Sequence, residues 1–153
     1  QAKATVWDVP GHTRGHIVYH FAGAHAAFVG DTLFAMGCGR LFEGTPAQMW
    51  GSLQKILRWP DDTRLYCAHE YTQNNARFAL TVEPDNAALR ERAAAVASRR
   101  AANLPTVPST LAEERATNPF LRPTSRGLKE TIGLPQAADV DVFAKTRALK
   151  DAF

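Results

Sequence analysis

The chain has 153 residues, of which 45% are hydrophobic and 22% charged, and its formal net charge is +3. These values are ordinary for a globular protein with its own core, and they argue against a disordered or fibrous one. Because neither a run of 18 apolar residues nor a signal-peptide pattern occurs, we expect a cytoplasmic protein with no membrane partner.

Strand-like and helical patterns alternate in the first half of the chain. Short runs rich in Val, Ile, Tyr, Phe or Leu predict strands at 4–9, 16–22, 26–29 and 64–68, the second and third forming a hairpin. Thr45 and Pro46 predict a helix start, since an N-cap followed by proline leads into an apolar stripe that ends before Pro60. This order predicts an α/β sheet whose loops at one edge carry the chemistry.

In the second half of the chain, the segments at 72–82 and 85–102 are dominated by Ala, Arg, Asn and Glu, which is typical of surface helices. We expect helices at 72–82, 85–102 and 141–153, a short helix capped by Ser109 or Thr110, a linker at 103–108 and a non-helical anchor at 118–122. The basic residues gather in this half, which favours an anionic ligand. They alternate with alanine and acids instead of forming a dense stripe with aromatics, so we expect no nucleic-acid partner.

Three side chains that can bind metal follow predicted strands directly. His12 lies in a Gly-His-Thr-Arg-Gly-His turn, Asp31 follows Gly30, and His69 follows the strand at 64–68. Imidazole and carboxylate groups in loops held by strands are typical of hydrolytic zinc or iron sites. Each also has an ordinary alternative, as a hydrogen-bonded loop histidine or a turn-capping aspartate.

We expect the other histidines and both cysteines to have no direct part in the chemistry. We expect His16 to hydrogen-bond within its loop, and His20 and His25 to lie exposed in or beside the hairpin. Cys38 and Cys67 form no Cys-x-x-Cys pair, which indicates two reduced thiols in or near the core.

Taken together, the motifs resemble the C-terminal portion of the glyoxalase II (hydroxyacylglutathione hydrolase) family of the metallo-β-lactamase superfamily. The resemblance is carried by Pro-Gly-His-Thr-x-Gly-His, Gly-Asp-Thr-Leu-Phe-x-x-Gly-Cys-Gly-Arg-x-Phe-Glu-Gly, His-Glu-Tyr-Thr, Asn-Pro-Phe-Leu-Arg and a terminal Arg-x-x-Lys-Asp-x-Phe. It implies the second half of a metallo-β-lactamase-like αββα sandwich at 1–72. A helical glutathione-binding domain would follow at 73–153.

The resemblance also implies a reaction, the hydrolysis of the thioester S-D-lactoylglutathione to glutathione and D-lactate in methylglyoxal detoxification. His12 would bind one metal and His69 a second. Asp31 would bridge the two metals and act in catalysis, with a metal-bridging hydroxide attacking the thioester. Two divalent ions are implied, zinc first, with iron and manganese as alternatives, and they would lower the pKa of bound water and polarise the carbonyl.

Five residues would bind the glutathione part of the substrate by the same resemblance, namely Arg40, Phe42, Tyr71, Arg147 and Lys150. Phe42 stands where some members carry tyrosine, so only packing is expected from it. Arg147 and Lys150 are spaced i, i+3 and would share a helix face, where they could clamp one carboxylate. A solvated basic helix end is the alternative for this pair.

One part of the family pattern does not occur in these 153 residues: the upstream Thr-His-x-His-x-Asp-His segment, which supplies four further ligands. We therefore expect a fragment with an incomplete metal site and little activity by itself, belonging to a protein that is monomeric when intact. Two alternatives stay open. One is a mononuclear-iron enzyme similar to persulfide dioxygenases, and the other is a non-catalytic glutathione-binding module.

Overall fold

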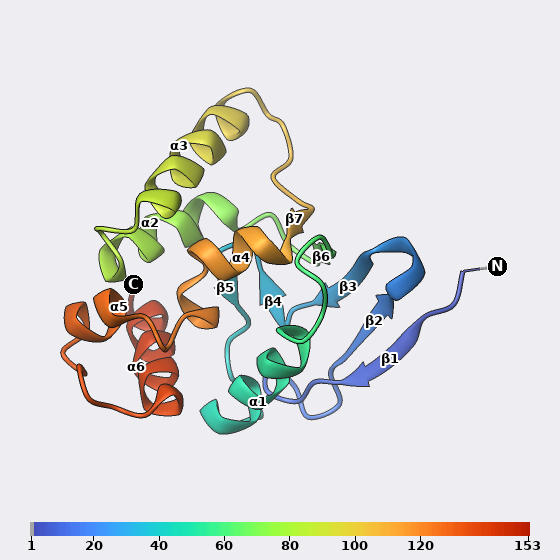
Figure 1. The fold of residues 1–153 in the computed structure, drawn as a ribbon, viewed down its shortest axis with the longest axis horizontal. Coiled ribbons are helices and arrows are strands. Elements are labelled where there is room, and N and C mark those ends of the chain that lie inside the picture. The colour runs from blue at the N-terminus through green and yellow to red at the C-terminus, as the bar shows by residue number, and fades with distance from the viewer. Residues whose placement is uncertain (1) are drawn as a thin grey trace.

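A five-stranded sheet forms one side of the molecule, and helices lie against it (Figure 1). The structure is a computed structural model that describes residues 2–153. The sheet has the order β1-β2-β3-β6-β7, with β1 Thr5–Asp8, β2 Ile17–Phe21, β3 Ala26–Gly30, β6 Arg64–Cys67 and β7 Ser109–Thr110. A separate two-stranded hairpin pairs β4 (Leu33–Phe34) with β5 (Gly37–Cys38). The helices are α1 Pro46–Ile56, α2 Thr72–Val82, α3 Ala87–Ala101, α4 Leu111–Thr117, α5 Arg126–Thr131 and α6 Asp139–Ala152.

Strand direction explains why the chemistry gathers at one edge. β2 is antiparallel to both β1 and β3, and β3 is parallel to β6 through the α1 crossover. β1, β3 and β6 therefore run the same way, and their carboxyl ends meet at the same edge of the sheet. The predicted hairpin and α/β order are confirmed.

Helix α1 forms where the sequence predicts it. Thr45 and Gln48 make a reciprocal capping box, the Thr45 hydroxyl accepting from the Gln48 N–H while the Gln48 side chain accepts from the Thr45 N–H. Met49, Leu53 and Ile56 are fully buried on one face of the helix. This apolar stripe fixes α1 against the core.

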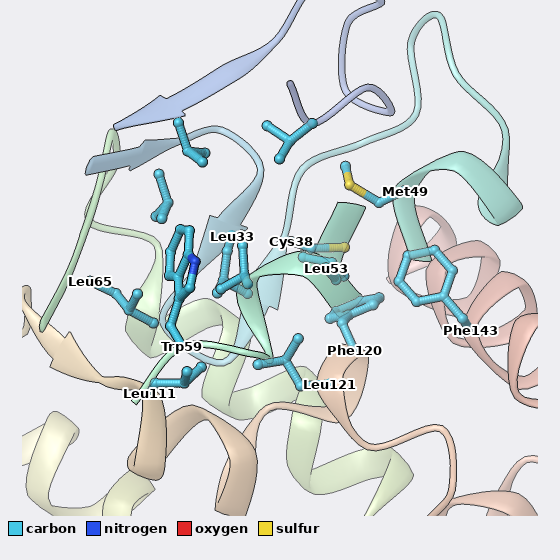
Figure 2. Close-up of a cluster of buried hydrophobic side chains, with 14 of the residues drawn as sticks. Leu33, Cys38, Met49, Leu53, Trp59, Leu65, Leu111, Phe120, Leu121 and Phe143 are labelled. Carbon is cyan, nitrogen blue, oxygen red and sulfur yellow. The ribbon is translucent and has the colours of Figure 1, made fainter. Parts of the chain in front are cut away.

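The hydrophobic core joins both halves of the chain. Leu33 and Leu53 from the first half lie close to Phe120 and Phe143 from the second, with Cys38 among them (Figure 2). The Phe120 and Phe143 rings meet edge to face, with centroids 5.9 Å apart. The second half of the chain thus packs against the first half through this shared core.

Some elements differ from the sequence prediction. β7 extends the sheet with residues from the second half, and β4, β5 and α5 were not predicted. The segment at 118–122, expected to be non-helical, contains one turn of 3₁₀ helix at Pro119–Leu121, because the Asn118 side chain accepts from the Phe120 N–H. Pairs of two-residue strands carry too little pattern for a sequence signal, and tertiary contacts decide them.

The expected exposure of His20 is wrong. Its side chain is buried and stacks on Trp59, with ring centroids 4.2 Å apart at 11°. His20 alternates with Tyr19 along β2 and lies on the core side, so strand periodicity determines its burial. Burial lowers the pKa of His20 from its ordinary value of 6.5.

We expect this buried histidine to make stability depend on pH. Because its pKa is lower in the folded than in the unfolded chain, the unfolded chain takes up the proton first, and stability is lost as the pH falls below 6.5. His20→Phe keeps the stacking and removes the titration. The melting temperature of each chain is measured from about pH 8 to about pH 5, and it should fall less steeply with pH for H20F than for the unmodified chain. Equal pH dependence of the two melting temperatures would contradict this explanation.

The outer face of the sheet is apolar and exposed. Val6, Ile17, Tyr19 and Phe28 are each 41–54% exposed, and the Phe28 ring stacks on Tyr66. Exposed apolar patches of this kind are typical of surfaces that another polypeptide covers. None of the helices in residues 2–153 combines the length and the apolar composition that spanning a bilayer requires.

Candidate active site

The three predicted metal ligands meet at the edge where β1, β3 and β6 end. His12 Nε2 lies 3.7 Å from Asp31 Oδ2, and His69 Nε2 lies 3.1 Å from Asp31 Oδ1. The Asp31 carboxylate therefore lies between the two imidazoles, with one oxygen towards each. Asp31 and His69 follow neighbouring parallel strands, and the Ala68 N–H donates to the Gly30 carbonyl to join their ends.

The His12 ring is held by the segment around Arg40. Its Nδ1 lies 2.8 Å from the Arg40 carbonyl, which can only accept, so Nδ1 carries a proton and Nε2 is the nitrogen that faces Asp31. Gly39 lets the chain pass this close. A Cβ there would lie 2.0 Å from the Asp31 carbonyl oxygen and 3.0 Å from His12 Nδ1.

Asp31 is positioned through its backbone by His16. The Asp31 N–H donates to His16 Nε2 at 3.1 Å, which confirms the expected loop hydrogen bond of His16. Gly30 has φ +53°, a left-handed conformation that a side chain would strain, and a Cβ there would also collide with the His16 ring. Burial, and the positive charge that His12 can carry, lower the pKa of His16 and favour the neutral, accepting ring.

The donor set fits part of a divalent-metal site. Asp31 Oδ1 is buried and accepts no hydrogen bond, although His69 Nε2 is near, so a lone pair of the carboxylate remains available. Within residues 2–153, no group of three or more His, Cys, Asp or Glu side chains is arranged to hold one ion. Two imidazoles facing opposite oxygens of one carboxylate suit two ions, each contacted by one histidine and the shared aspartate.

Aromatic rings flank both histidines. Tyr71 stacks on His69 with centroids 4.7 Å apart, and Phe34 meets both rings edge to face. Phe42 lies 5.1 Å from His12, centroid to centroid, and its side chain is 70% exposed. These rings form an apolar wall beside the polar cluster.

All eight residues singled out from the sequence line one cleft of about 530 Å³. They are His12, Asp31, Arg40, Phe42, His69, Tyr71, Arg147 and Lys150. Sequence reasoning missed Phe34, Cys38, Gly39, Asn74 and Asn75, which also line it. The signal for the two asparagines was their position one helical turn after Tyr71.

The cationic side chains of the cleft are not equivalent. Arg147 is only 5% exposed and already engaged, with Nη1 donating to the Cys38 carbonyl at 2.7 Å and Nη2 lying 2.8 Å from Asp151 Oδ1. Lys150 has no carboxylate within ion-pair distance among the described residues, and its Nζ lies over the Phe78 and Phe153 rings. Burial, followed by repulsion from Arg147 and Arg40, lowers the pKa of Lys150. Of the cationic side chains in the cleft, Lys150 is therefore the one that carboxylates neutralise least.

Side chains of the helical half hold the backbone at 34–38 in place. Asn75 donates to the Ala35 carbonyl, and Asn118 donates to the carbonyls of Phe34 and Gly37. Glu114, 0% exposed, accepts from the Met36 N–H at 2.9 Å. The loop between Asp31 and Arg40 is therefore positioned by residues far away in the sequence.

The Cys38 thiol lines the cleft but is not suited to act as a nucleophile. Burial raises its pKa to about 11, against the opposing effect of Arg147. We expect alkylation of Cys38 at about pH 8 to be at least about 100-fold slower in the folded chain than in the unfolded chain. Mass spectrometry after timed iodoacetamide treatment measures this, and rapid labelling of folded Cys38 would contradict the assigned burial.

The fold and the arrangement at the strand ends are those of a metallo-β-lactamase-type protein. The metallo-β-lactamase superfamily profile matches residues 6–69, and the hydroxyacylglutathione hydrolase C-terminus profile matches residues 70–153. The second match covers more than half of the chain. The chain belongs to the hydroxyacylglutathione hydrolase family, as its motifs indicated.

Relatives of known name support the same family. Hydroxyacylglutathione hydrolases from Maricaulis maris and Brucella ovis are 56% and 58% identical, each over 151 residues and 99% of this chain. The chain spans 59% of the length of both relatives. Among solved structures, ETHE1 from Myxococcus xanthus is 21% identical with a TM-score of 0.55, over 100% of this chain and 56% of its own. TTHA1623, solved in a di-iron-bound form, is 25% identical with a TM-score of 0.51, over 77% of this chain and 42% of its own.

Proposed function

We propose that this chain is part of a thioester hydrolase that converts S-D-lactoylglutathione to glutathione and D-lactate. The observation that carries the proposal is the convergence of the imidazole–carboxylate cluster and the cationic side chains on one cleft. Such a cleft can place the reacting carbonyl of an anionic thioester beside the groups that activate water. The names of the relatives support the substrate class.

We propose that His12, Asp31 and His69 bind two divalent cations, with zinc the first candidate, and that Asp31 bridges them. When bound, such cations lower the pKa of water and polarise a thioester carbonyl. The hydrogen bond from His12 Nδ1 to the Arg40 carbonyl orients the ring and leaves Nε2 as the nitrogen that faces the metal site. The hydrogen bond from the Asp31 N–H to His16 holds the strand exit that carries the carboxylate.

The glutathione moiety is proposed to bind along the rest of the cleft. Lys150 and Arg40 attract its carboxylates, while Tyr71 and Phe42 pack against its chain beside the histidines. Arg147 donates to Cys38 and pairs with Asp151, so it would act in part by fixing the loop that carries Arg40. The phenylalanine at position 42 offers packing without a hydroxyl.

The remaining metal ligands are proposed to come from elsewhere in the whole protein. Three side chains, with Asp31 shared, give each of two cations only two protein ligands, whereas a catalytic zinc ion usually has three protein ligands and a water. The exposed apolar sheet face of Val6, Ile17, Tyr19 and Phe28 supports a partner layer supplied by the same protein. In this proposal residues 1–72 belong to the metal-binding unit and residues 73–153 to the glutathione-binding unit.

A chimera tests the proposed reaction. The part of the Maricaulis maris relative that this chain does not match is joined to it, and loss of S-D-lactoylglutathione is followed with zinc present. We expect thioester hydrolysis that disappears with a chelator and returns with metal. A folded, metal-loaded chimera that leaves the thioester intact, or that instead consumes oxygen with glutathione persulfide, would overturn the proposal.

A further inference from the structure

Asp151 places a carboxylate among the arginines of the cleft. It lies in the last turn of α6, and its Oδ1 is 2.8 Å from Arg147 Nη2, accepts from Arg147 Nε at 3.1 Å, and lies 3.8 Å from Arg40 Nε. One carboxylate oxygen therefore interacts with two guanidinium groups. These are the interactions that the carboxylate of a bound peptide would make.

Helix stability does not explain a carboxylate at this position. The C-terminal end of a helix carries partial negative charge, so an acidic residue there is disfavoured, although its i, i+4 pair with Arg147 offsets part of that cost. Arg147 is also held by two contacts that do not involve Asp151, its bond to the Cys38 carbonyl and its position over the Phe120 ring. The side chains of Asp151 and Arg40 are 43% and 62% exposed, so both can exchange this contact for one with a ligand.

We propose that Asp151 is a specificity-determining residue that acts as an internal competitor for the anionic end of the substrate. In the ligand-free cleft, its carboxylate pairs with Arg40 and Arg147. Its negative charge also weakens the attraction of the three cationic side chains, Lys150, Arg40 and Arg147, for an anionic ligand. A ligand with a single carboxylate gains little by displacing it. A glutathione derivative, which adds further carboxylate and backbone contacts, displaces it from Arg40. This inference rests on the proposed function.

Binding of glutathione to the full 153-residue chain tests the inference without metal or turnover. Titration calorimetry at low salt should show Asp151→Asn binding glutathione about three- to tenfold more tightly than the unmodified chain, because a like charge near the ligand is removed. The gain should shrink at high salt, where exposed charges are screened. Asp151→Glu, which keeps the charge, should bind as the unmodified chain does.

A matched control separates the local effect from overall charge. Asp141→Asn changes the net charge equally, on an exposed residue in the first turn of the same helix, and should leave binding unchanged. Thermal unfolding checks that the variants fold, and Asp151→Ser, with a smaller neutral side chain, must shift binding in the same direction as D151N. Unchanged or weaker binding by D151N and D151S overturns the inference alone. If neither the unmodified chain nor the variants bind glutathione, the proposed function fails and the inference fails with it.

Discussion

Replacing Glu114 by alanine should lower the free energy of unfolding by about 3–5 kcal/mol, because it leaves the largely buried Arg92 guanidinium without its anionic partner and the buried Met36 N–H without its acceptor. Glu114 is 0% exposed, and its Oε1 accepts from Arg92 Nη2 at 2.6 Å. Its Oε2 accepts from the Met36 N–H and from Asn118 Nδ2. Urea unfolding followed by circular dichroism measures the loss.

Glu91→Ala is the matched control, since Glu91 lies exposed beside Arg92 on α3. Its removal should change stability by less than about 0.5 kcal/mol. The loop that Glu114 holds connects Asp31 to Arg40, so E114A should also broaden or shift the NMR signals of residues 34–38. A loss of stability equal in the two variants would contradict the assigned network.

Asp31→Ala should weaken Zn²⁺ binding to the chain at least about 100-fold. Loss of an outer hydrogen-bond partner alone typically weakens metal binding about 10- to 100-fold, and Asp31 contacts both histidines directly. Without the carboxylate, His12 and His69 have no common anionic ligand to neutralise two cations. Competition against a chromophoric chelator gives the affinity of each chain.

Asp62→Ala provides the control for Asp31. Asp62 Oδ2 lies 2.8 Å from His25 Nδ1, so it is also a carboxylate paired with an imidazole, but its side chain is 66% exposed. Its removal should leave Zn²⁺ affinity unchanged within about twofold, since exposed pairs contribute little. An equal effect of both substitutions would mean that Asp31 has no special place in metal binding.

The convergence of His12, Asp31 and His69 at one edge of the sheet could be predicted because the signals were local. Apolar runs followed at once by His12, Asp31 and His69 identified strand exits, and parallel strand order then brings such exits together. The Thr45 cap and Pro46 marked α1 for the same reason. Where one residue and its immediate neighbours determine the structure, the sequence pattern is sufficient to predict it.

Features that depend on distant contacts could not be predicted in this way. Arg147 is buried where it donates to the Cys38 carbonyl, which is 109 residues away in the chain. Strand alternation places His20 on the core side of β2, but its stacking partner Trp59 comes from the segment after α1. The place of Asp151 between two arginines follows only once α6 is packed against the loop that carries Arg40.

We propose that this chain carries three ligands of a two-metal thioesterase site and not a complete set. The most direct measurement combines metal analysis of the dialysed 153-residue chain with its rate of S-D-lactoylglutathione hydrolysis. We expect fewer than two tightly bound metal ions and a rate close to the uncatalysed one. Two tightly bound ions together with turnover of about 10 s⁻¹ or more, as is typical of enzymes, would contradict the account.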